Sequence, residues 1–264
     1  MLALENLTIG YDDKRVIESL NTTIQKDKIT VIIGPNGCGK STLLKAVTRV
    51  IKPNNGQVIL DGKDVHKMPT KVIARQMSFL PQSHDKVTGL TVYELVSYGR
   101  YPYQKGLGKL SKTDYEKIDW ALAATGITSI KHNMMDALSG GQKQRAWIAM
   151  ALVQDTEMIF LDEPTTYLDI SHQLEILHLL KTLNEKNNRT IVMVLHDINQ
   201  AARYADYVIA IKDGVIRYNA NAYDVIKKDV IRDVFEVDVD IMHDPETNRP
   251  IVYNYKKVEK KGLL

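Results

Sequence analysis

Residues 34–41 read Gly-Pro-Asn-Gly-Cys-Gly-Lys-Ser and match the pattern G-x-x-x-x-G-K-[ST]. The stretch follows a strand-like apolar run at 29–33 and opens a helix that we predict from about Ser41 to Val50. Glycines let consecutive backbone N–H groups curl around an anion, and the helix N-terminus adds partial positive charge. The Lys40 ammonium can then reach the β- and γ-phosphates, and the Ser41 hydroxyl can bind Mg²⁺. A chance glycine-rich turn is the alternative, and the strand–loop–helix context disfavours it. The sequence therefore predicts a nucleotide triphosphate site.

A second stretch, residues 158–163, supplies the carboxylates that such a site needs. Four apolar residues, as in a buried parallel strand, are followed by Asp162 and Glu163. The carboxyl end of such a strand faces the crevice where open α/β sheets bind ligands. We expect Asp162 to hold Mg²⁺, directly or through water, and Glu163 to polarise the attacking water. Standing alone, the pair would be better interpreted as an ordinary acidic strand end.

The third stretch, Leu138-Ser-Gly-Gly-Gln142, places two glycines just before another predicted helix. Its exposed amides would form a second anion site at a helix N-terminus. The chain has only one glycine-rich phosphate loop, so the second anion site is expected to meet the nucleotide of another copy. A two-fold dimer satisfies this arrangement. The alternative is a Gly-Gly turn that merely caps a helix.

The order of predicted elements indicates one α/β domain with a helical insertion. Strands are predicted at 2–9, 29–33, 57–61 and 77–80, and helices at 91–98, 112–125 (with Ser111 as N-cap) and after Gly140. Strands at 158–162, 190–195 and 207–211 then alternate with helices at 171–186 and 197–204, which is typical of a parallel sheet. A hairpin, two short helices and two more strands follow at 215–255, and the tail from about Lys256 is expected to be solvated.

Composition excludes several classes of protein. The 264 residues carry a net charge of +3, too small to indicate nucleic-acid binding, with the basic residues scattered among acids. A single cysteine, Cys38, excludes an internal disulfide framework and a cysteine zinc site. No stretch approaches the roughly 18 apolar residues of a membrane span, and the N-terminus lacks the order of a signal peptide. We expect a cytoplasmic chain whose membrane role, if it has one, comes through a partner.

Together these motifs resemble the ATP-binding cassette (ABC) ATPases over nearly the whole chain. Residues 34–42 resemble the Walker A motif, 138–142 the signature and 158–163 the Walker B motif. The resemblance implies a P-loop fold with a RecA-like mixed sheet core, an antiparallel β portion and an inserted α-helical subdomain. The expected units are the core with its β subdomain at 1–87 and 155–240, the helical subdomain at 88–154, and a C-terminal β extension and tail at 241–264.

The resemblance also implies roles for single residues that are individually unremarkable. Gln82 is similar to the Q-loop glutamine, which senses magnesium and the membrane partner; Asp169 is similar to the D-loop aspartate; His196 is similar to the switch histidine at the γ-phosphate. Tyr11 occupies the place of an aromatic that stacks on adenine. The expected catalytic residues are Glu163, His196, Gln82 and Lys40, and the expected metal ligands are Ser41, Gln82 and Asp162. The expected ATP-binding residues are Tyr11, Gly34, Pro35, Asn36, Gly37, Cys38, Gly39, Lys40, Ser41 and Thr42, with Ser139, Gly140, Gly141 and Gln142 facing the partner's ATP.

Cys38 departs from the small serine or alanine common at its loop position. Its backbone amide, rather than its sulfur, would cradle phosphate, so we interpret it as a tolerated small residue and not as a redox switch.

Two classes of ABC protein remain to be compared, the importer ATPase and the non-transport ATPase. Fewer than 100 residues separate Lys40 from Leu138 with no sustained heptads, which excludes the coiled-coil repair type. One cassette per chain disfavours translation factors. The iron–sulfur assembly type is not excluded by architecture.

Finer resemblance favours the importers of ferric siderophores, haem and cobalamin. It lies in residues 89–103 and 165–173, and in the stretches LVSYGRYPYQKG and IVMVLHDINQA, which look most like Gram-positive ferric-hydroxamate ATPases. The aromatic and apolar stretch 90–103 could form a groove for a helix of a permease. The resemblance implies an ATP-dependent homodimer, with Mg²⁺, peripheral to the cytoplasmic face of the membrane. It would dock on transmembrane permease subunits and be served indirectly by a siderophore-binding protein.

Overall fold

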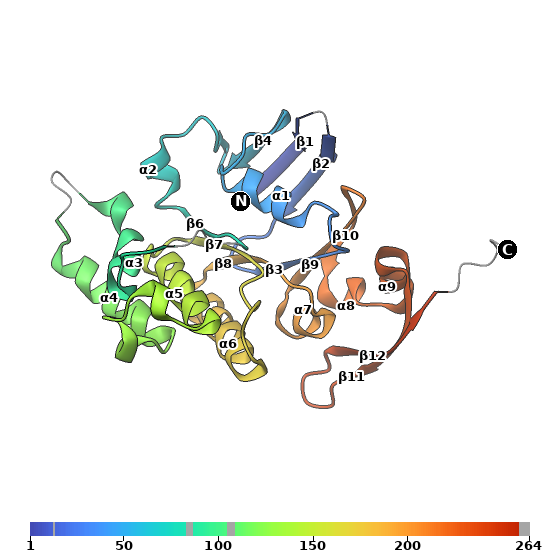
Figure 1. The fold of residues 1–264 in the computed structure, drawn as a ribbon. Coiled ribbons are helices and arrows are strands. Elements are labelled where there is room, and N and C mark those ends of the chain that lie inside the picture. Colours follow the sequence, from blue (N-terminus) through green and yellow to red (C-terminus); the bar gives the residue numbers. More distant parts are fainter. Residues whose placement is uncertain (13, 83–86, 105–108, 259–264) are drawn as a thin grey trace.

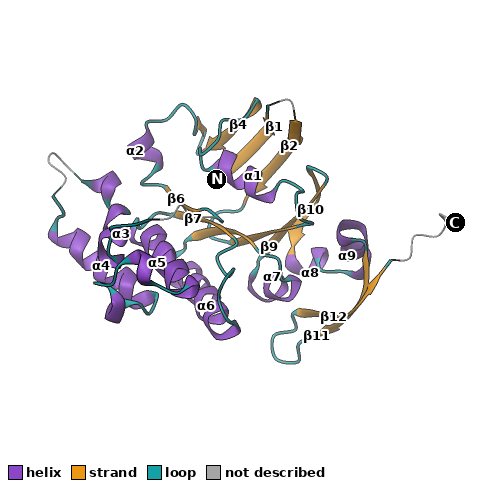
Figure 2. Ribbon diagram, viewed as in Figure 1, coloured by secondary structure: helices purple, strands orange, loops and turns teal. Residues whose placement is uncertain are grey.

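The computed structural model describes residues 1–12, 14–82, 87–104 and 109–258. Lys105 and Gly106 of the importer-like stretch lie outside them. Within these ranges no helix is both long and apolar enough to cross a bilayer. Figures 1 and 2 show a central sheet with helices packed below it, and a separate small sheet above it that carries the N-terminus.

The central sheet has six strands in the order β10-β9-β3-β8-β7-β6. Its parallel strands are β3 (Ile29–Ile33), β6 (Met77–Leu80), β7 (Met158–Asp162), β8 (Thr190–Val194) and β9 (Tyr207–Lys212), and β10 (Val215–Asn221) joins antiparallel at one edge. Every residue of β3, β7 and β8 is buried, as expected for strands covered on both faces. The continuous apolar runs in the sequence reflect this double burial.

The small sheet is antiparallel, in the order β2-β1-β4-β5. It is built from β1 (Leu2–Tyr11), β2 (Lys14–Ile24), β4 (Asn55–Leu60) and β5 (Lys63–Asp64). Its inner face and the central sheet enclose α1 (Lys40–Val47), whose Leu43, Leu44 and Val47 join their common core. The short helix α2 (Thr70–Ile73) connects this layer to β6.

A helical lobe lies between β6 and β7 in the chain, although these two strands pair in the sheet. It consists of α3 (Val92–Tyr98), α4 (Lys112–Ala124) and α5 (Gly140–Val153), with short 3-10 turns η1 (Tyr101–Tyr103), η2 (Thr128–Ile130) and η3 (Met135–Ala137). All three helices begin with a capping box, formed by Thr91 with Glu94, Ser111 with Asp114, and Ser139 with Gln142. The lobe has its own apolar core. The predicted fold class, with its helical insertion, is confirmed.

The remaining helices cover the central sheet and lead to the C-terminal hairpin (Figure 1). They are α6 (Ile170–Asn187), α7 (Ile198–Tyr204), α8 (Ala222–Val225) and α9 (Lys228–Phe235), followed by the paired strands β11 (Val237–His243) and β12 (Pro250–Lys257). The expected boundary between the core and the C-terminal extension, at 240/241, would divide β11, so we propose 236/237 instead. The boundaries of the helical subdomain, at 87/88 and 154/155, stay as proposals.

Two expectations from sequence were wrong. β2 was missed because bulges shift its register, so its buried residues Ile17, Leu20 and Ile24 recur at intervals of three and four, as in a helix. Helix α1 ends at Val47, so the predicted end at Val50 was too late, and Val50 is exposed. Lys256 and Lys257, at the start of the expected tail, are exposed at the end of β12; residues 259–264 lie outside the described part.

Candidate active site

The glycine-rich loop is held in its curled form by contacts that admit no side chain at two glycines. Gly34 has φ +152°, and a Cβ there would lie 2.1 Å from the Ile211 carbonyl oxygen. Gly39, with φ +106°, ends the loop against Ile17 of β2 and immediately precedes α1. Only glycine adopts these conformations without strain. The loop is therefore built between β3, β9 and the small sheet, at the N-terminus of α1.

Lys40 is buried and lies back across the loop. Its Nζ donates to the carbonyl oxygens of Gly34 at 2.9 Å and Pro35 at 2.8 Å. An ammonium has three donors. Two bind these carbonyl oxygens, and the third meets only the Cys38 sulfur at 4.0 Å, a weak acceptor that an anion in the loop could replace.

Ser41 and Asp162 meet at the base of the loop. The Ser41 hydroxyl donates to Oδ1 of Asp162 at 3.0 Å, which joins the start of α1 to the end of β7. Oδ2 of Asp162 is buried and has no hydrogen-bond partner among the described residues. Burial raises the pKa of Asp162, and the neighbouring Glu163 raises it further, while the Ser41 hydrogen bond lowers it.

This orphaned oxygen is the test of whether the residues fit a magnesium ion. Mg²⁺ prefers hard oxygen ligands and is usually held by one or two protein groups together with substrate phosphates. A buried, unpartnered carboxylate oxygen beside a hydroxyl supplies such ligands, so the residues present fit the ion. No larger cluster of metal-binding side chains occurs in the described ranges.

Glu163 is held from two sides, although it directly follows β7 at a backbone φ of +54°. Its Oε1 lies 2.6 Å from Nε2 of His196, and its Oε2 accepts the Thr166 hydroxyl at 3.2 Å. Glu163 is buried, whereas the His196 side chain is 47% exposed. The arrangement presents a fixed carboxylate beside an accessible imidazole. Sequence reasoning did not single out Thr166, although it lies in the quoted stretch 165–173.

Lys40, Ser41, Glu163 and His196 line one open hollow of about 440 Å³, which we call the loop hollow. Gln82, two residues after β6, also lines it, whereas Asp162 is buried next to it. Its lining residues are Val16, Asn36, Gly37, Gly39, Lys40, Ser41, Thr42, Gln82, Glu163 and His196. Val16 was not predicted from the sequence. Its side chain lies beside Gly39, and finding it would have required predicting strand β2.

Other predicted residues lie outside the loop hollow. Tyr11 is the last residue of β1 and is 45% exposed. It pairs with Lys14 of β2, and Lys14 lies two residues before Val16 in the chain. Ser139 caps α5, and Asp169 caps α6, where it accepts the backbone N–H of His172 at 2.9 Å. This bond lowers the pKa of the Asp169 carboxyl, and so does the contact of its Oδ1 with the His172 ring Nδ1 at 2.8 Å. One chain therefore does not bring the signature to its own loop hollow.

The side chain of Cys38 is not among those that line the loop hollow. It is buried in the core shared by the two sheets, with Sγ 4.0 Å from Nζ of Lys40. Burial raises the pKa of its thiol. This geometry supports its interpretation as a small residue that contributes backbone to the loop.

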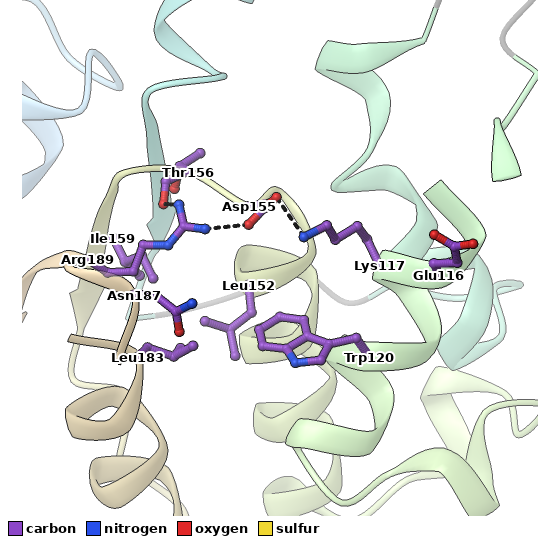
Figure 3. Close-up of a pocket in the computed structure, with 10 residues that line it drawn as sticks. All are labelled: Glu116, Lys117, Trp120, Leu152, Asp155, Thr156, Ile159, Leu183, Asn187 and Arg189. Atoms are coloured by element: carbon purple, nitrogen blue, oxygen red, sulfur yellow. Dashed lines mark hydrogen bonds and ion pairs between the residues drawn. The ribbon is translucent and has the colours of Figure 1, made fainter. Parts of the chain in front are cut away.

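A second hollow of about 360 Å³ separates the helical lobe from the central sheet, and we call it the interlobe hollow. Figure 3 shows Lys117 and Arg189 pointing toward Asp155 from two sides, with Glu116 apart from them. Asp155 accepts Lys117 of α4 at 3.0 Å and Arg189, just before β8, at 2.6 Å. Arg189 also donates to the Thr156 carbonyl oxygen, and the Trp120 indole stands beside Leu152 (Figure 3). The central charges of this hollow are satisfied internally.

Comparison with known proteins extends these observations. A family profile described as "ABC transporter" matches residues 17–166. The chain is 51% identical over 263 residues to the iron(3+)-hydroxamate import ATP-binding protein FhuC of Bacillus subtilis, covering 100% of this chain and 98% of that protein. It is 44% identical to the ferric enterobactin transport ATP-binding protein FepC of Escherichia coli, covering 94% and 92%.

Solved structures agree. The ATP-binding cassette MJ0796, dimeric and bound to ADP and Pi, matches with a TM-score of 0.77 and 30% identity, over 84% of this chain and 99% of that one. An inward-facing ABC transporter of metal-chelate type matches with a TM-score of 0.81 and 25% identity, over 98% of both chains.

Proposed function

This chain belongs to the ABC transporter family of ATP-binding cassettes, and we propose that it is the ATPase subunit of an importer of ferric siderophores, of the hydroxamate class. As an ABC ATPase it hydrolyses ATP to energise transport. The observation that carries the substrate assignment is 51% identity along the entire chain to a ferric-hydroxamate import ATPase. The other relative described above, at 44% identity, also acts on a ferric siderophore.

We assign the chemical step to the fixed carboxylate of Glu163. Its two oxygens are oriented by His196 and Thr166, so it can accept a proton from water attacking the γ-phosphate. The Lys40 ammonium binds the β- and γ-phosphates, and His196, being accessible, meets the γ-phosphate. Mg²⁺, when bound by Ser41, Asp162 and Gln82 with the phosphates, would neutralise the charge that develops on them.

The remaining site residues act, in this proposal, beyond the loop hollow of one chain. Tyr11 would stack on adenine, next to Val16 at the edge of the hollow. Ser139, Gly140, Gly141 and Gln142 would bind the γ-phosphate held by a second copy, with Asp169 at the same interface. The dimeric form of MJ0796 supports this pairing. The dimer would dock on permease subunits at the cytoplasmic face of the membrane, and a siderophore-binding protein would deliver the cargo.

The experiment is growth and ⁵⁵Fe uptake in a strain that lacks this gene and every other siderophore ATPase gene. We expect no growth on ferric-hydroxamate iron, recovery with the wild-type gene, and no recovery with Lys40→Ala, which cannot hold the γ-phosphate. Iron supplied by a siderophore-independent route serves as the growth control. Wild-type complementation that restores cobalamin or haem uptake, but not hydroxamate iron, would overturn the substrate assignment.

A further inference from the structure

Helix α7 begins two residues after His196, so its position fixes the backbone that carries the imidazole. Asp197 caps it by accepting the backbone N–H groups of Asn199 at 2.7 Å and Gln200 at 3.0 Å. Both of these bonds stay within the first turn of α7. A link from α7 to the segment 167–169 is made by other side chains.

Two glutamines supply that link. The Gln200 side-chain Nε2 donates to Oε1 of Gln173 at 2.7 Å, and Gln173 uses its own Nε2 to donate to the backbone carbonyl of Leu168 at 3.0 Å. Both side chains are partly buried. A continuous hydrogen-bonded path thus runs from Leu168, beside Asp169, through α6 to α7.

The two glutamines belong to stretches that the sequence singled out separately, 165–173 and 191–201. Gln173 lies on α6 and Gln200 on α7, and nothing in the spacing of the two stretches relates them. In the folded chain these two glutamines are each other's partners. The pairing gives both stretches one physical role.

Given the proposed function above, in which Asp169 meets a second copy, we propose that Gln173 and Gln200 are positioning residues that couple the segment 167–169 to His196. Formation of the dimer interface would fix the Leu168 carbonyl, and Gln173 and Gln200 would transmit that position to α7. His196 already lies 2.6 Å from Glu163 in the single chain, and the seated partner would hold it there more firmly. Hydrolysis would thereby be faster in the closed dimer.

The competing explanation is that these amides merely hold α7 in place. Asn199 provides a matched control, because it also ties α7 to another segment. Its Nδ2 donates to the Val252 carbonyl at 3.0 Å and its Oδ1 accepts the Val252 backbone N–H at 2.7 Å. Asn199 therefore anchors the same helix to β12 without touching segment 167–169.

The test is steady-state ATPase activity of the full chain carrying Gln173→Leu, Gln200→Leu, both changes, or Asn199→Leu. Each glutamine change should lower kcat about three- to tenfold, the effect of one lost hydrogen bond in the reacting state. KM for ATP should stay within about twofold, and the double variant should be no slower than the single ones. Asn199→Leu should lower Tm but leave kcat within about twofold.

A finer variant separates the two halves of the path. Gln173→Glu keeps the acceptor for Gln200 but loses the donor to Leu168, so its kcat should fall as far as that of Gln173→Leu. Normal kcat in Gln173→Glu, or equal losses in the glutamine and Asn199 variants, would overturn the coupling. Glu163→Gln, measured in parallel, tests the proposed function itself: if it stays active, that assignment fails independently of the glutamines.

Discussion

The loop hollow and the interlobe hollow lie at opposite ends of the same strands and are similar in size, about 440 and about 360 Å³. The loop hollow is lined by Glu163, which directly follows the carboxyl end of β7, whereas Thr156 and Arg189 of the interlobe hollow precede β7 and β8. Both contain carboxylates and cations. They differ in what those groups bind.

In the interlobe hollow, Asp155 is satisfied by Lys117 and Arg189. Next to the loop hollow, Oδ2 of Asp162 is buried without a partner among the described residues, and the third donor of Lys40 meets only the Cys38 sulfur at 4.0 Å. A buried unpaired acceptor costs about 1–3 kcal/mol, so each one calls for an explanation, such as a bound ion, a water or a catalytic role. Volume therefore does not distinguish the two hollows; unsatisfied groups do.

The largest expected difference comes from removing one carboxylate in each hollow. Glu163→Gln should lower ATP turnover about 10²–10⁴-fold, because the amide cannot accept a proton from water. ATP binding should persist, so the variant should accumulate as an ATP-bound dimer in size-exclusion chromatography with ATP. The matched change Glu116→Gln, at the rim of the interlobe hollow, should leave turnover within about twofold. Equal losses in both variants would remove the distinction between the hollows.

The next prediction compares Asp162→Asn with Asp155→Asn, which should change the unfolding free energy in opposite directions. Asp162→Asn should weaken magnesium-dependent ATP binding at least about tenfold, yet raise the unfolding free energy of the nucleotide-free protein by about 1 kcal/mol. Asp155→Asn should lower the unfolding free energy by about 1 kcal/mol, since its partly exposed ion pairs contribute modestly, and leave ATP affinity unchanged. Urea titration and ATP-binding titrations measure both quantities. Destabilisation by Asp162→Asn would contradict the orphaned-oxygen interpretation.

The stability contributed by Asp162 should also depend on pH. Its folded pKa is raised by burial above the unfolded value, so the folded state binds more protons between these two pKa values. The unfolding free energy of the nucleotide-free wild type should therefore fall as pH rises through that interval. The difference in unfolding free energy between wild type and Asp162→Asn should become smaller at pH values below the ordinary carboxyl pKa. A pH-independent difference would show that the charge of Asp162 is not its cause.

The smallest effect concerns Cys38, which has its backbone in the loop and its side chain in the core. Because burial raises its thiol pKa, maleimide labelling of the native protein at neutral pH should be slow and should speed up in denaturant. Cys38→Ser should retain ATPase activity within about twofold, and any labelled fraction should be inactive. Rapid labelling of a protein that keeps full ATPase activity would show that the Cys38 sulfur is not buried beside the phosphate loop.

Much of this protein was readable from short-range sequence patterns. The phosphate loop, the N-cap of α4 at Ser111, and the buried runs of β3, β7 and β8 each depend on neighbours within a few residues. β2 was not readable, because its bulges break the alternation on which strand prediction depends. Thr166 and Val16 were missed because single hydroxyl and apolar residues carry no signal of what they face.

The sequence by itself determined the fold class and the residue types of the site, since glycine, lysine and carboxylates at those spacings have few other uses. Only the tertiary structure decided which groups are satisfied. It showed that Asp155 is paired while Asp162 is not, that Cys38 points into the core, and that Gln173 meets Gln200. These facts depend on side chains brought together across many residues of chain, and a local pattern contains no record of such distances.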